Sequence, residues 1–501
     1  DMSNYFYNLL KIFMINKISN TGFNFDNSYI ELPPEFYSPA NLQPVKSPQL
    51  VILNNELSNS LGLNTDFLKS QEGIYIMSGN IKIPDGAYIS QAYAGHQFGG
   101  FTMLGDGRAL LIGEQITPSN QRFDIQLKGS GRTPYSRNGD GRAVLGPMLR
   151  EYIISEAMHG LNIPTTRSLS VISTGENVYR ETIQQGAILT RVASSHIRFG
   201  TFEYAAYMLD YEKLKKLSDY TIKRHFPFLE NNENKYINLL DEVIKLQASL
   251  VAKWQSVGFI HGVLNTDNMS ICGETIDYGP CAFMDVYNPD TVFSSIDTNG
   301  RYAYKNQIAI VNWNLYRLAE TLLPLINSDE NKAIELAQNS LSKFINLATS
   351  NLSHEMCSKI GIFEPKTSDI DLLNELLNMM QKYKEDYTNT FIALTFNDLP
   401  QKGMFISEEF INWKKKWEET LTLQNKSKDE VFDLMKNSNP AVIPRNHRVE
   451  EALSAANNRD FSVMNNLLKA LSNPFEHSEF QKEYAKLPST PQCNYRTYCG
   501  T

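Results

Sequence analysis

The sequence predicts an α+β fold of two lobes, a small β-rich lobe followed by a large lobe of helices. Short apolar runs bounded by turn residues lie before residue 200, and long amphipathic patterns dominate after it. Length supports the same division, because 501 residues exceed the size at which a single hydrophobic core stops growing. A composition of 42% hydrophobic and 20% charged residues is typical of a folded globular chain.

The small lobe is predicted from four strand-like runs and one helix. Residues 20–60 are rich in Asn, Pro and Ser and are expected to form an extended arm around this core. We therefore assign residues 1–85 to an N-terminal extension and residues 86–205 to the small lobe. The runs span 109–112, 123–127, 168–172 and 186–191, and the helical pattern spans 147–159.

The large lobe is predicted from a series of amphipathic helices. The pattern over residues 236–257 repeats its apolar positions every three or four residues and ends shortly before His261. We assign residues 206–400 to the large lobe and 401–501 to a helical C-terminal extension and tail. Further helices are predicted at 313–326, 332–348, 370–394, 408–423 and 450–471.

Charge and cysteine content exclude several functional classes. A net charge of -8 argues against a nucleic-acid partner, which would require a basic face. The five cysteines are scattered and no pair has CxxC spacing, which argues against a disulfide framework or a structural zinc site. The apolar stretch at residues 5–15 has neither a basic region before it nor a cleavage site after it. We therefore expect a cytoplasmic protein without a membrane partner.

One stretch, from His261 to Asp285, carries the densest candidate chemistry and reads HGVLNTDNMSICGETIDYGPCAFMD. In the protein-kinase pattern H-R-D-x-x-x-x-N, the Asp accepts a proton from the substrate and the Asn holds a metal ion. Laid over His261, the pattern places Asn268 at the Asn and Val263 at the Asp. A valine cannot accept a proton, so either the site is inactive or its base lies elsewhere.

Asp267 is the alternative base, because it directly precedes Asn268 and neighbouring side chains of an extended loop point to opposite sides. One side chain can then face a metal ion while the other faces an incoming hydroxyl. A simple Asx turn at Asp267 remains the alternative interpretation. Asp277, in the following Asp-Tyr-Gly, takes a second metal-binding role. Asn268 and Asp277 supply the oxygen ligands that Mg²⁺ prefers, and the sequence does not distinguish Mg²⁺ from Mn²⁺.

Lys128 and Glu151 form a candidate ion pair of the kinase type. Lys128 follows the strand-like run at 123–127, and Glu151 lies on the next predicted helix. In kinases such a pair orients the lysine on phosphate oxygens. A surface lysine and a solvated glutamate remain the alternative interpretation.

The remaining candidates for phosphate contacts are glycine turns and arginines. Glycine lets backbone N–H groups close on anionic oxygens, and the planar arginine fork matches phosphate oxygens. A plain hairpin turn and ordinary surface ion pairs remain alternatives. The candidates are Gly105, Gly107, Arg108, Asp140, Gly141, Arg191 and Arg198.

With these motifs in order, the chain resembles the selenoprotein O (SelO, YdiU) family of kinase-like proteins. The resemblance is carried by QAYAGHQFGGF, LGDGRA, LKGSGRTPYSRNGDGRA, RVASSHIRFGTFE, HGVLNTDNMS and DYGP, and by NPAVIPRNH near residues 439–447. It implies a kinase fold that binds ATP in a reversed orientation and transfers AMP to Ser, Thr or Tyr hydroxyls of proteins. A nucleotide-binding pseudokinase scaffold without turnover and a kinase that transfers the γ-phosphate remain the alternatives.

The resemblance also implies a role for each candidate residue. Asp267 is then the proton acceptor, Asn268 and Asp277 hold the metal ion, and Glu151 supports Lys128. The chain keeps a cysteine near its end at Cys499, but residues 292–295 lack the cysteine that related proteins carry there, so redox control remains open. The implied ATP contacts are Gly105, Gly107, Arg108, Lys128, Asp140, Gly141, Arg191, Arg198 and Asp277.

Overall fold

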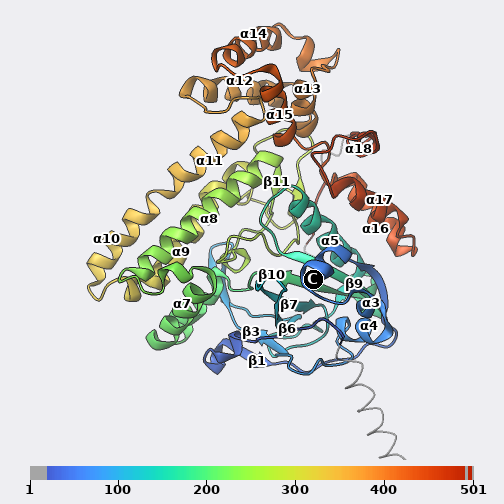
Figure 1. The fold of residues 1–501 in the computed structure, drawn as a ribbon, viewed down its shortest axis with the longest axis vertical. Helices are drawn as coiled ribbons and strands as arrows, with labels where there is room; N and C mark the ends of the chain where they lie inside the picture. The colour runs from blue at the N-terminus through green and yellow to red at the C-terminus, as the bar shows by residue number, and fades with distance from the viewer. Residues whose placement is uncertain (1–19, 491–494, 499–501) are drawn as a thin grey trace, which may run out of the picture. The chain divides into compact units, whose positions relative to one another are not determined.

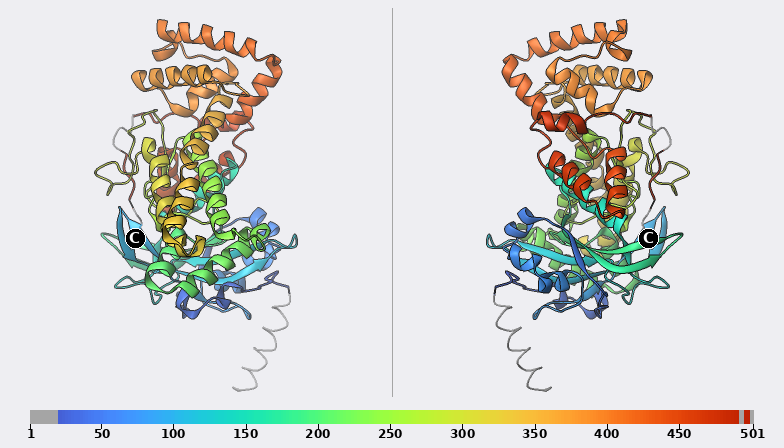
Figure 2. Two further views of the ribbon diagram at one scale, coloured as in Figure 1. Left: turned by 90° about the vertical axis from the view of Figure 1, so that its left-hand side faces the viewer. Right: turned by 90° about the vertical axis from the view of Figure 1, so that its right-hand side faces the viewer.

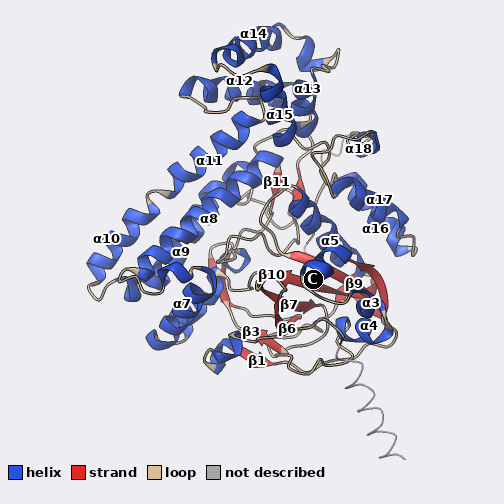
Figure 3. Ribbon diagram, viewed as in Figure 1, coloured by secondary structure: helices blue, strands red, loops and turns tan. Residues whose placement is uncertain are grey.

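The computed structural model describes residues 20–490 and 495–498, and the chain divides into two compact units. The first unit contains the residues up to Tyr93 together with Met103–Tyr152 and Thr166–His196. The second contains Ala94–Thr102, Ile153–Thr165 and the remainder from Ile197. Figures 1 and 3 show that the main sheet lies in the first unit and that helices dominate the second. The α+β fold class with a β-rich and a helical lobe is confirmed.

The first unit is built on an antiparallel sheet with the strand order β1-β3-β6-β7-β10-β9-β2, and β8 pairs with β10 outside this path. The four predicted strand-like runs are confirmed and lie in β6, β7, β9 and β10. The strands are β1 (Tyr37–Pro39), β2 (Gln49–Leu53), β3 (Ile89–Gln91), β6 (Ala109–Ile116), β7 (Arg122–Lys128), β8 (Ala143–Val144), β9 (Arg167–Tyr179) and β10 (Ile183–Ala193).

Residues before the predicted small lobe contribute to the same sheet and core. Strand β2 pairs with β9, and three short helices follow it whose N-cap side chains Asn54, Asn64 and Ser70 accept backbone N–H groups. Leu68 and Met77 of these helices pack with Leu127 in one apolar cluster. The helices are α2 (Asn55–Ser60), α3 (Thr65–Lys69) and α4 (Gln71–Met77), with 3-10 turns η1 (Tyr29–Glu31) and η2 (Pro34–Phe36) before β1.

The predicted helix at 147–159 is confirmed as α5 (Leu145–Gly160), which begins in the first unit and ends in the second. In the second unit, α8 (Lys235–Val257) lies beside α9 (Gln307–Ile326) and α11 (Phe344–Ser358), as Figures 1 and 2 show. Helix α8 ends at Gly258, whose φ of 75° turns the chain into strand β11 (Phe259–Ile260). Strand β11 pairs with β12 (Ala282–Phe283), so these two strands bracket the candidate catalytic stretch.

The C-terminal helices share a core with these strands. Trp413 and Trp417 stack in a cluster that also contains Ile260 and Ala282. The predicted helix at 408–423 is confirmed as α14, and residues Lys428–Ser438 form α15. The other elements of this unit are β4 (Ala94–Gln97), β5 (Gly100–Met103), α6 (Phe199–Met208), α7 (Tyr211–His225), η3 (Pro227–Leu229), η4 (Thr266–Asn268), η5 (Tyr304–Asn306), η6 (Gly403–Ile406) and α18 (Glu479–Tyr484).

Three helices predicted as continuous are each divided in two. The run at 332–348 is α10 (Glu330–Leu341) and α11, the run at 370–394 is α12 (Thr367–Tyr383) and α13 (Tyr387–Phe396), and the run at 450–471 is α16 (Asn446–Asn457) and α17 (Ser462–Leu471). Left-handed residues cause the latter two breaks, with φ of 55° at Lys384 and 62° at Arg459. Among the described residues, none of the helices combines the length and apolar character required to cross a lipid bilayer.

Candidate active site

The loop that follows β11 is fixed by backbone contacts of His261. The imidazole Nε2 bonds the carbonyl oxygen of Ile276 at 2.8 Å, and Nδ1 accepts the N–H of Val263 at 3.4 Å. Complete burial lowers the pKa of His261, so the ring is neutral and donates through Nε2. The ring therefore positions the loop, and both its nitrogens are occupied by backbone.

Asp267 lies in the 3-10 turn η4 with its carboxyl group buried. Its Oδ2 accepts a long contact of 3.5 Å from Gln97 Nε2, and its Oδ1 has no hydrogen-bond partner among the described residues. Burial raises the pKa of Asp267 to about 7, although Arg198 opposes the shift. Gly95 makes room for this carboxyl group, because a Cβ there would lie 2.5 Å from Oδ1. An under-bonded carboxyl group with a pKa near neutrality is suited to accept a proton.

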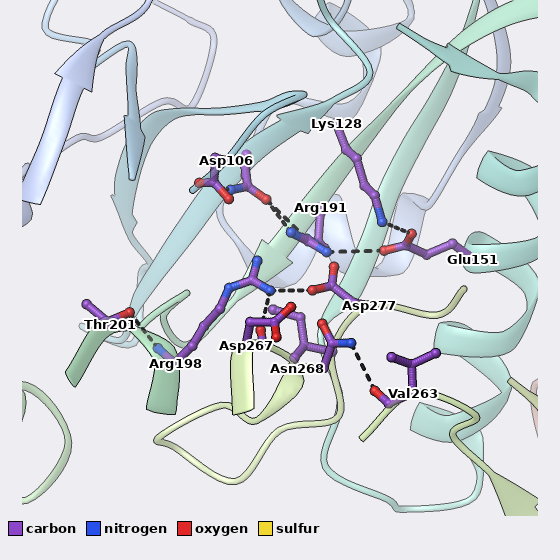
Figure 4. Close-up of polar contacts among 12 residues, drawn as sticks. Asp106, Lys128, Glu151, Arg191, Arg198, Thr201, Val263, Asp267, Asn268 and Asp277 are labelled. Carbon is purple, nitrogen blue, oxygen red and sulfur yellow. Dashed lines mark hydrogen bonds and ion pairs between the residues drawn. The ribbon is translucent and has the colours of Figure 1, made fainter. Parts of the chain in front are cut away.

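Asn268 lies in the 3-10 turn η4, and Asp277 lies in the loop that precedes β12. The Asn268 amide donates to the carbonyl oxygen of Val263 at 2.9 Å, which leaves the amide oxygen as its acceptor group (Figure 4). Asp277 adopts a φ of 62°, a left-handed conformation in which Asp and Asn are enriched. Within the described residues there is no group of three or more His, Cys, Asp and Glu that could hold a metal ion. This donor set fits a hard cation that completes its shell with nucleotide oxygens and water.

Arg198, at the start of helix α6, contacts both Asp267 and Asp277. Its guanidinium donates to the main-chain carbonyl of Asp267 at 2.8 Å and pairs with the carboxylate of Asp277 (Figure 4). The guanidinium therefore contacts the backbone of Asp267 rather than its carboxyl group. Its position is set by pairing of residues 197–199 with 269–271, in which Phe199 N donates to Met269 O at 2.9 Å.

The hairpin β4–β5 and helix α6 hold the loop from the other side. The N–H of His96 donates to Thr266 Oγ1 at 2.7 Å, and Thr266 Oγ1 donates to Glu203 Oε2 at 2.7 Å. His96 Nδ1 lies 2.6 Å from the other oxygen of Glu203. Burial raises the pKa of Glu203 to about 7. Sequence reasoning missed His96 and Glu203, although they lie in QAYAGHQFGGF and RVASSHIRFGTFE, two of the motifs that carry the family resemblance.

In the first unit, Lys128 and Arg191 share the carboxylate of Glu151. Lys128 Nζ lies 2.5 Å from Oε2, and Arg191 lies 3.5 Å from Oε1 (Figure 4). Arg191 opposes Gln126 in the β7–β10 register and donates to its Oε1 at 2.6 Å, while Gln126 donates to Asp106 at 3.1 Å. The predicted ion pair is therefore present and buried, and a surface location for Lys128 and Glu151 is excluded.

The predicted glycine turns of the first unit lie in two loops that contact each other. The first loop precedes β6, and the second lies between β7 and β8. Gly105 has a φ of 109°, and a Cβ there would lie 2.5 Å from the ring of Tyr135 in the second loop. Thr133 Oγ1 donates to Asp106 O at 2.6 Å and fixes the two loops together. Gly107 and Arg108 continue the first loop, and Gly141 lies in the second.

Asp140, also in the second loop, binds the Arg180 guanidinium through both oxygens, at 2.9 and 3.0 Å. This pairing lowers the pKa of Asp140. Sequence reasoning missed Arg180, which lies 40 residues further along the chain. The structure thus gathers Arg198, Asp267, Asn268 and Asp277 in the second unit, and the other candidates in the first.

The order of these elements is that of a protein kinase. A lysine on a sheet strand pairs with a glutamate on the following helix, and a loop with Asn268 and a second loop with Asp-Tyr-Gly come later in the helical lobe. A solved structure titled "ROP2 from Toxoplasma gondii: A virulence factor with a protein- kinase fold and no enzymatic activity" aligns with 74% of this chain and 97% of its own, at 8% identity. Its TM-score of 0.25 is too low for inference, so the assignment depends on the elements themselves.

Comparison with known sequences identifies the family. The family model described as "Protein adenylyltransferase SelO" matches residues 20–472. A "Protein nucleotidyltransferase YdiU" of Bacillus cytotoxicus is 62% identical over 97% of this chain and 99% of its own. Relatives of the same name from Clostridium beijerinckii and Halalkalibacterium halodurans are 60% and 59% identical, each over 96% of this chain and 99% and 98% of their own. The chain therefore belongs to the SelO family of protein adenylyltransferases.

Proposed function

We propose that this chain transfers AMP from ATP to Ser, Thr or Tyr hydroxyls of proteins, with a divalent cation, Mg²⁺ or Mn²⁺. The observation that carries the proposal is Asp267, a buried carboxyl group with one unbonded oxygen and a pKa raised to about 7. It directly precedes Asn268, at a site where Val263 replaces the usual catalytic Asp. The names of the relatives favour a nucleotide, rather than a phosphate, as the transferred group.

In the proposed reaction the acceptor hydroxyl attacks the α-phosphorus of ATP. A bond forms between the hydroxyl oxygen and the α-phosphorus, and the bond from the α-phosphorus to the bridging oxygen breaks, so that pyrophosphate leaves. The hydroxyl proton passes to Oδ1 of Asp267. General-base catalysis of this kind typically contributes about 10²–10⁴-fold to the rate. The product is a phosphodiester between AMP and the acceptor side chain.

The remaining residues would position the nucleotide and its charge. The shared Glu151 carboxylate would orient the side chains of Lys128 and Arg191. These two cations would then bind phosphate oxygens of ATP. Asp140 would act through Arg180, whose guanidinium it holds in place. Contacts of ATP with Gly105, Gly107, Arg108, Gly141 and Arg198 are proposed on the resemblance alone.

Asn268 and Asp277 would hold the cation, through the amide oxygen and the carboxylate respectively. When bound, the cation would neutralise negative charge on the phosphate oxygens. Arg198 would keep the Asp277 carboxylate in place, because it already pairs with it in this structure. The same arginine holds the backbone of Asp267, so the base and the cation ligand share one support.

The experiment that tests this proposal compares ATP labelled at the α-phosphate with ATP labelled at the γ-phosphate, using the protein and a bacterial lysate as acceptors. We expect α-label on protein, and a loss of roughly 10²–10⁴-fold in rate for Asp267→Asn. Transfer of γ-label would instead identify a kinase. ATP binding by calorimetry without transfer of either label would identify a scaffold. Undiminished labelling by Asp267→Asn would overturn the assignment of the base.

A further inference from the structure

A cavity of about 550 Å³ lies in the second unit beside the catalytic loop. Its walls come from the β4–β5 hairpin, the segment before η5 and helix α9. The apolar part consists of Phe98, Ile296, Ala309 and Ile310, and Arg301 provides a cation. This volume falls within the range of pockets that bind ligands, roughly 300–1,000 Å³, and the mixture of apolar walls with a few polar groups is typical of them.

The wall of this cavity is continuous with the groups that hold Asp267. Phe98 donates its backbone N–H to Asn265 Oδ1 at 3.1 Å, and its ring lies 5.1 Å from the ring of Tyr302. The Tyr302 hydroxyl donates to the same oxygen of Asn265 at 2.5 Å. The residue before Phe98 is Gln97, which contacts the Asp267 carboxyl group. A group bound in the cavity therefore lies one residue away from the chain segment that touches the base.

Two apolar side chains of the cavity lining are exposed to solvent. The side chains of Phe98 and Ile296 are 41% and 57% exposed. Phe98 has a φ of 50°, a conformation that bulky residues rarely adopt, and a network of three hydrogen bonds around Asn265 and Thr266 maintains the surrounding loop. The structure thus holds an apolar ring at the surface, next to the base.

The lining of the cavity contains one basic side chain, Arg301, and one acidic side chain, Asp297. The Arg301 guanidinium lies 5.0 Å from the ring of Trp313 and 5.7 Å from the ring of Tyr302, and no carboxylate of the described residues lies within ion-pair distance of it. Asp297 also lines the cavity, but its two oxygens accept the N–H groups of Arg301 at 2.9 Å and Tyr302 at 2.8 Å. The carboxylate of Asp297 is therefore occupied, whereas the guanidinium of Arg301 is oriented by aromatic rings and can pair with an acidic group.

We propose that this cavity binds the acceptor protein, as an extended segment that carries an apolar side chain near the modified hydroxyl and an acidic side chain opposite Arg301. The proposal rests on the function proposed above, because the cavity wall at Phe98 directly follows Gln97, which contacts Asp267. An extended chain advances about 3.3 Å per residue, so an apolar side chain within about three residues of the hydroxyl can reach the cavity.

The test measures transfer of α-label to four synthetic peptides, each with a single Thr hydroxyl. Two carry Leu and two carry Gly at the neighbouring positions, and each pair differs by Asp or Lys further along. We expect the wild type to prefer Leu over Gly by roughly ten-fold in kcat/KM, the scale on which an apolar pocket discriminates. We also expect it to prefer Asp over Lys.

Two variants and a matched control assign these preferences to the cavity. Ile296→Asp should abolish the preference for Leu, and Arg301→Glu should reverse the preference for Asp. The control is Ile406→Asp, because Ile406 is 58% exposed in the same unit and lies outside the cavity. It should keep the wild-type preferences. Melting curves of the three variants establish that each one is folded before its kinetics are compared.

The outcomes separate this inference from the function on which it rests. Equal transfer to all four peptides by the wild type would overturn the acceptor site and leave adenylyl transfer intact. A changed KM for ATP with unchanged peptide preferences in Ile296→Asp would assign the cavity to the nucleotide and also overturn it. Failure of the wild type to transfer α-label to any peptide or lysate protein would overturn the proposed function itself.

Discussion

Substitution of Glu151 by glutamine tests the buried charge network of the first unit. The carboxylate lies 2.5 Å from Lys128 Nζ and 3.5 Å from Arg191 Nη1. With an effective dielectric constant of about 20, these distances correspond to attractions of about 7 and about 5 kcal/mol before the cost of desolvation. Desolvation cancels much of this, and removal of one member of a buried pair costs about 3–5 kcal/mol in practice. We expect Glu151→Gln to destabilise the first unit by that amount.

The assay must report on the first unit by itself. All four tryptophans lie in the second unit, so tryptophan fluorescence does not follow unfolding of the sheet. Hydrogen exchange does, because β7 and β10 lie at the centre of the sheet and exchange only when it opens. A loss of 3–5 kcal/mol should accelerate exchange in β7 and β10 by roughly 10²–10⁴-fold.

Two further variants define the cause. Glu242→Gln removes one member of a solvent-exposed pair with Lys245 on α8, and its effect should not exceed about 1 kcal/mol. The double variant Lys128→Met/Glu151→Gln removes both charges and should be more stable than Glu151→Gln alone. Unchanged exchange of β7 and β10 in Glu151→Gln, or a double variant less stable than it, would refute the reasoning.

Four other predictions address the second unit. Because burial raises the pKa of Asp267 to about 7, kcat/KM for transfer should rise with pH through that value, and a flat profile from pH 6 to 8 would contradict the base assignment. The same raised pKa contributes to the stability of the folded state below the unfolded pKa near 4, and this contribution is lost as pH rises through 7. Asp267→Asn should therefore melt at a higher temperature than the wild type at pH 8. Gly95→Ala places a methyl group 2.5 Å from Asp267 Oδ1 and 2.8 Å from its Cβ, so it should lower both kcat and the melting temperature, and unchanged kcat would contradict this packing. Arg445→Met leaves the buried carboxylates of Asp285 and Asp386 without their shared cation and should cost about 3–5 kcal/mol by tryptophan-monitored denaturation, whereas a loss below 1 kcal/mol would contradict it.

The sequence predicts the fold where local pattern and tertiary structure agree. The four strands and the helices α5, α8 and α14 are recognisable because each presents one continuous apolar face. The divided helices are not, because the apolar spacing continues across a turn of a few residues such as Lys384–Asp386. Strand β2 is not predicted, because the residues of β9 with which it pairs lie more than 100 positions away in the sequence. The domain boundaries at residues 85, 205 and 400 and the cytoplasmic location remain predictions.

The candidate site is likewise predictable from the sequence only in part. Adjacency in sequence was sufficient to place Asp267 beside Asn268, and strand order was sufficient to pair Lys128 with Glu151. The partners that tune these groups are distant in sequence: Gln97 and Gly95 approach Asp267 from the β4 hairpin. Single residues of this kind leave no periodic pattern in the sequence from which their contacts could be predicted. The assignments of the base, the ATP contacts and the cation ligands remain predictions, and Cys499 lies outside the described residues.

The contacts around Asp267 bear on its proposed role as a base, at a position where the kinase pattern has none. The charge of Arg198 lowers the pKa of the Asp267 carboxyl group, but by less than burial raises it. Its guanidinium donates to the backbone of residue 267 and pairs with Asp277, and Gly95 has no side chain that would crowd the carboxyl group. The carboxyl group is therefore buried without a strong partner, which raises its pKa and preserves its capacity to take a proton. Activity should therefore depend on the absence of a strong partner for the Asp267 carboxyl group as well as on the residues that contact it.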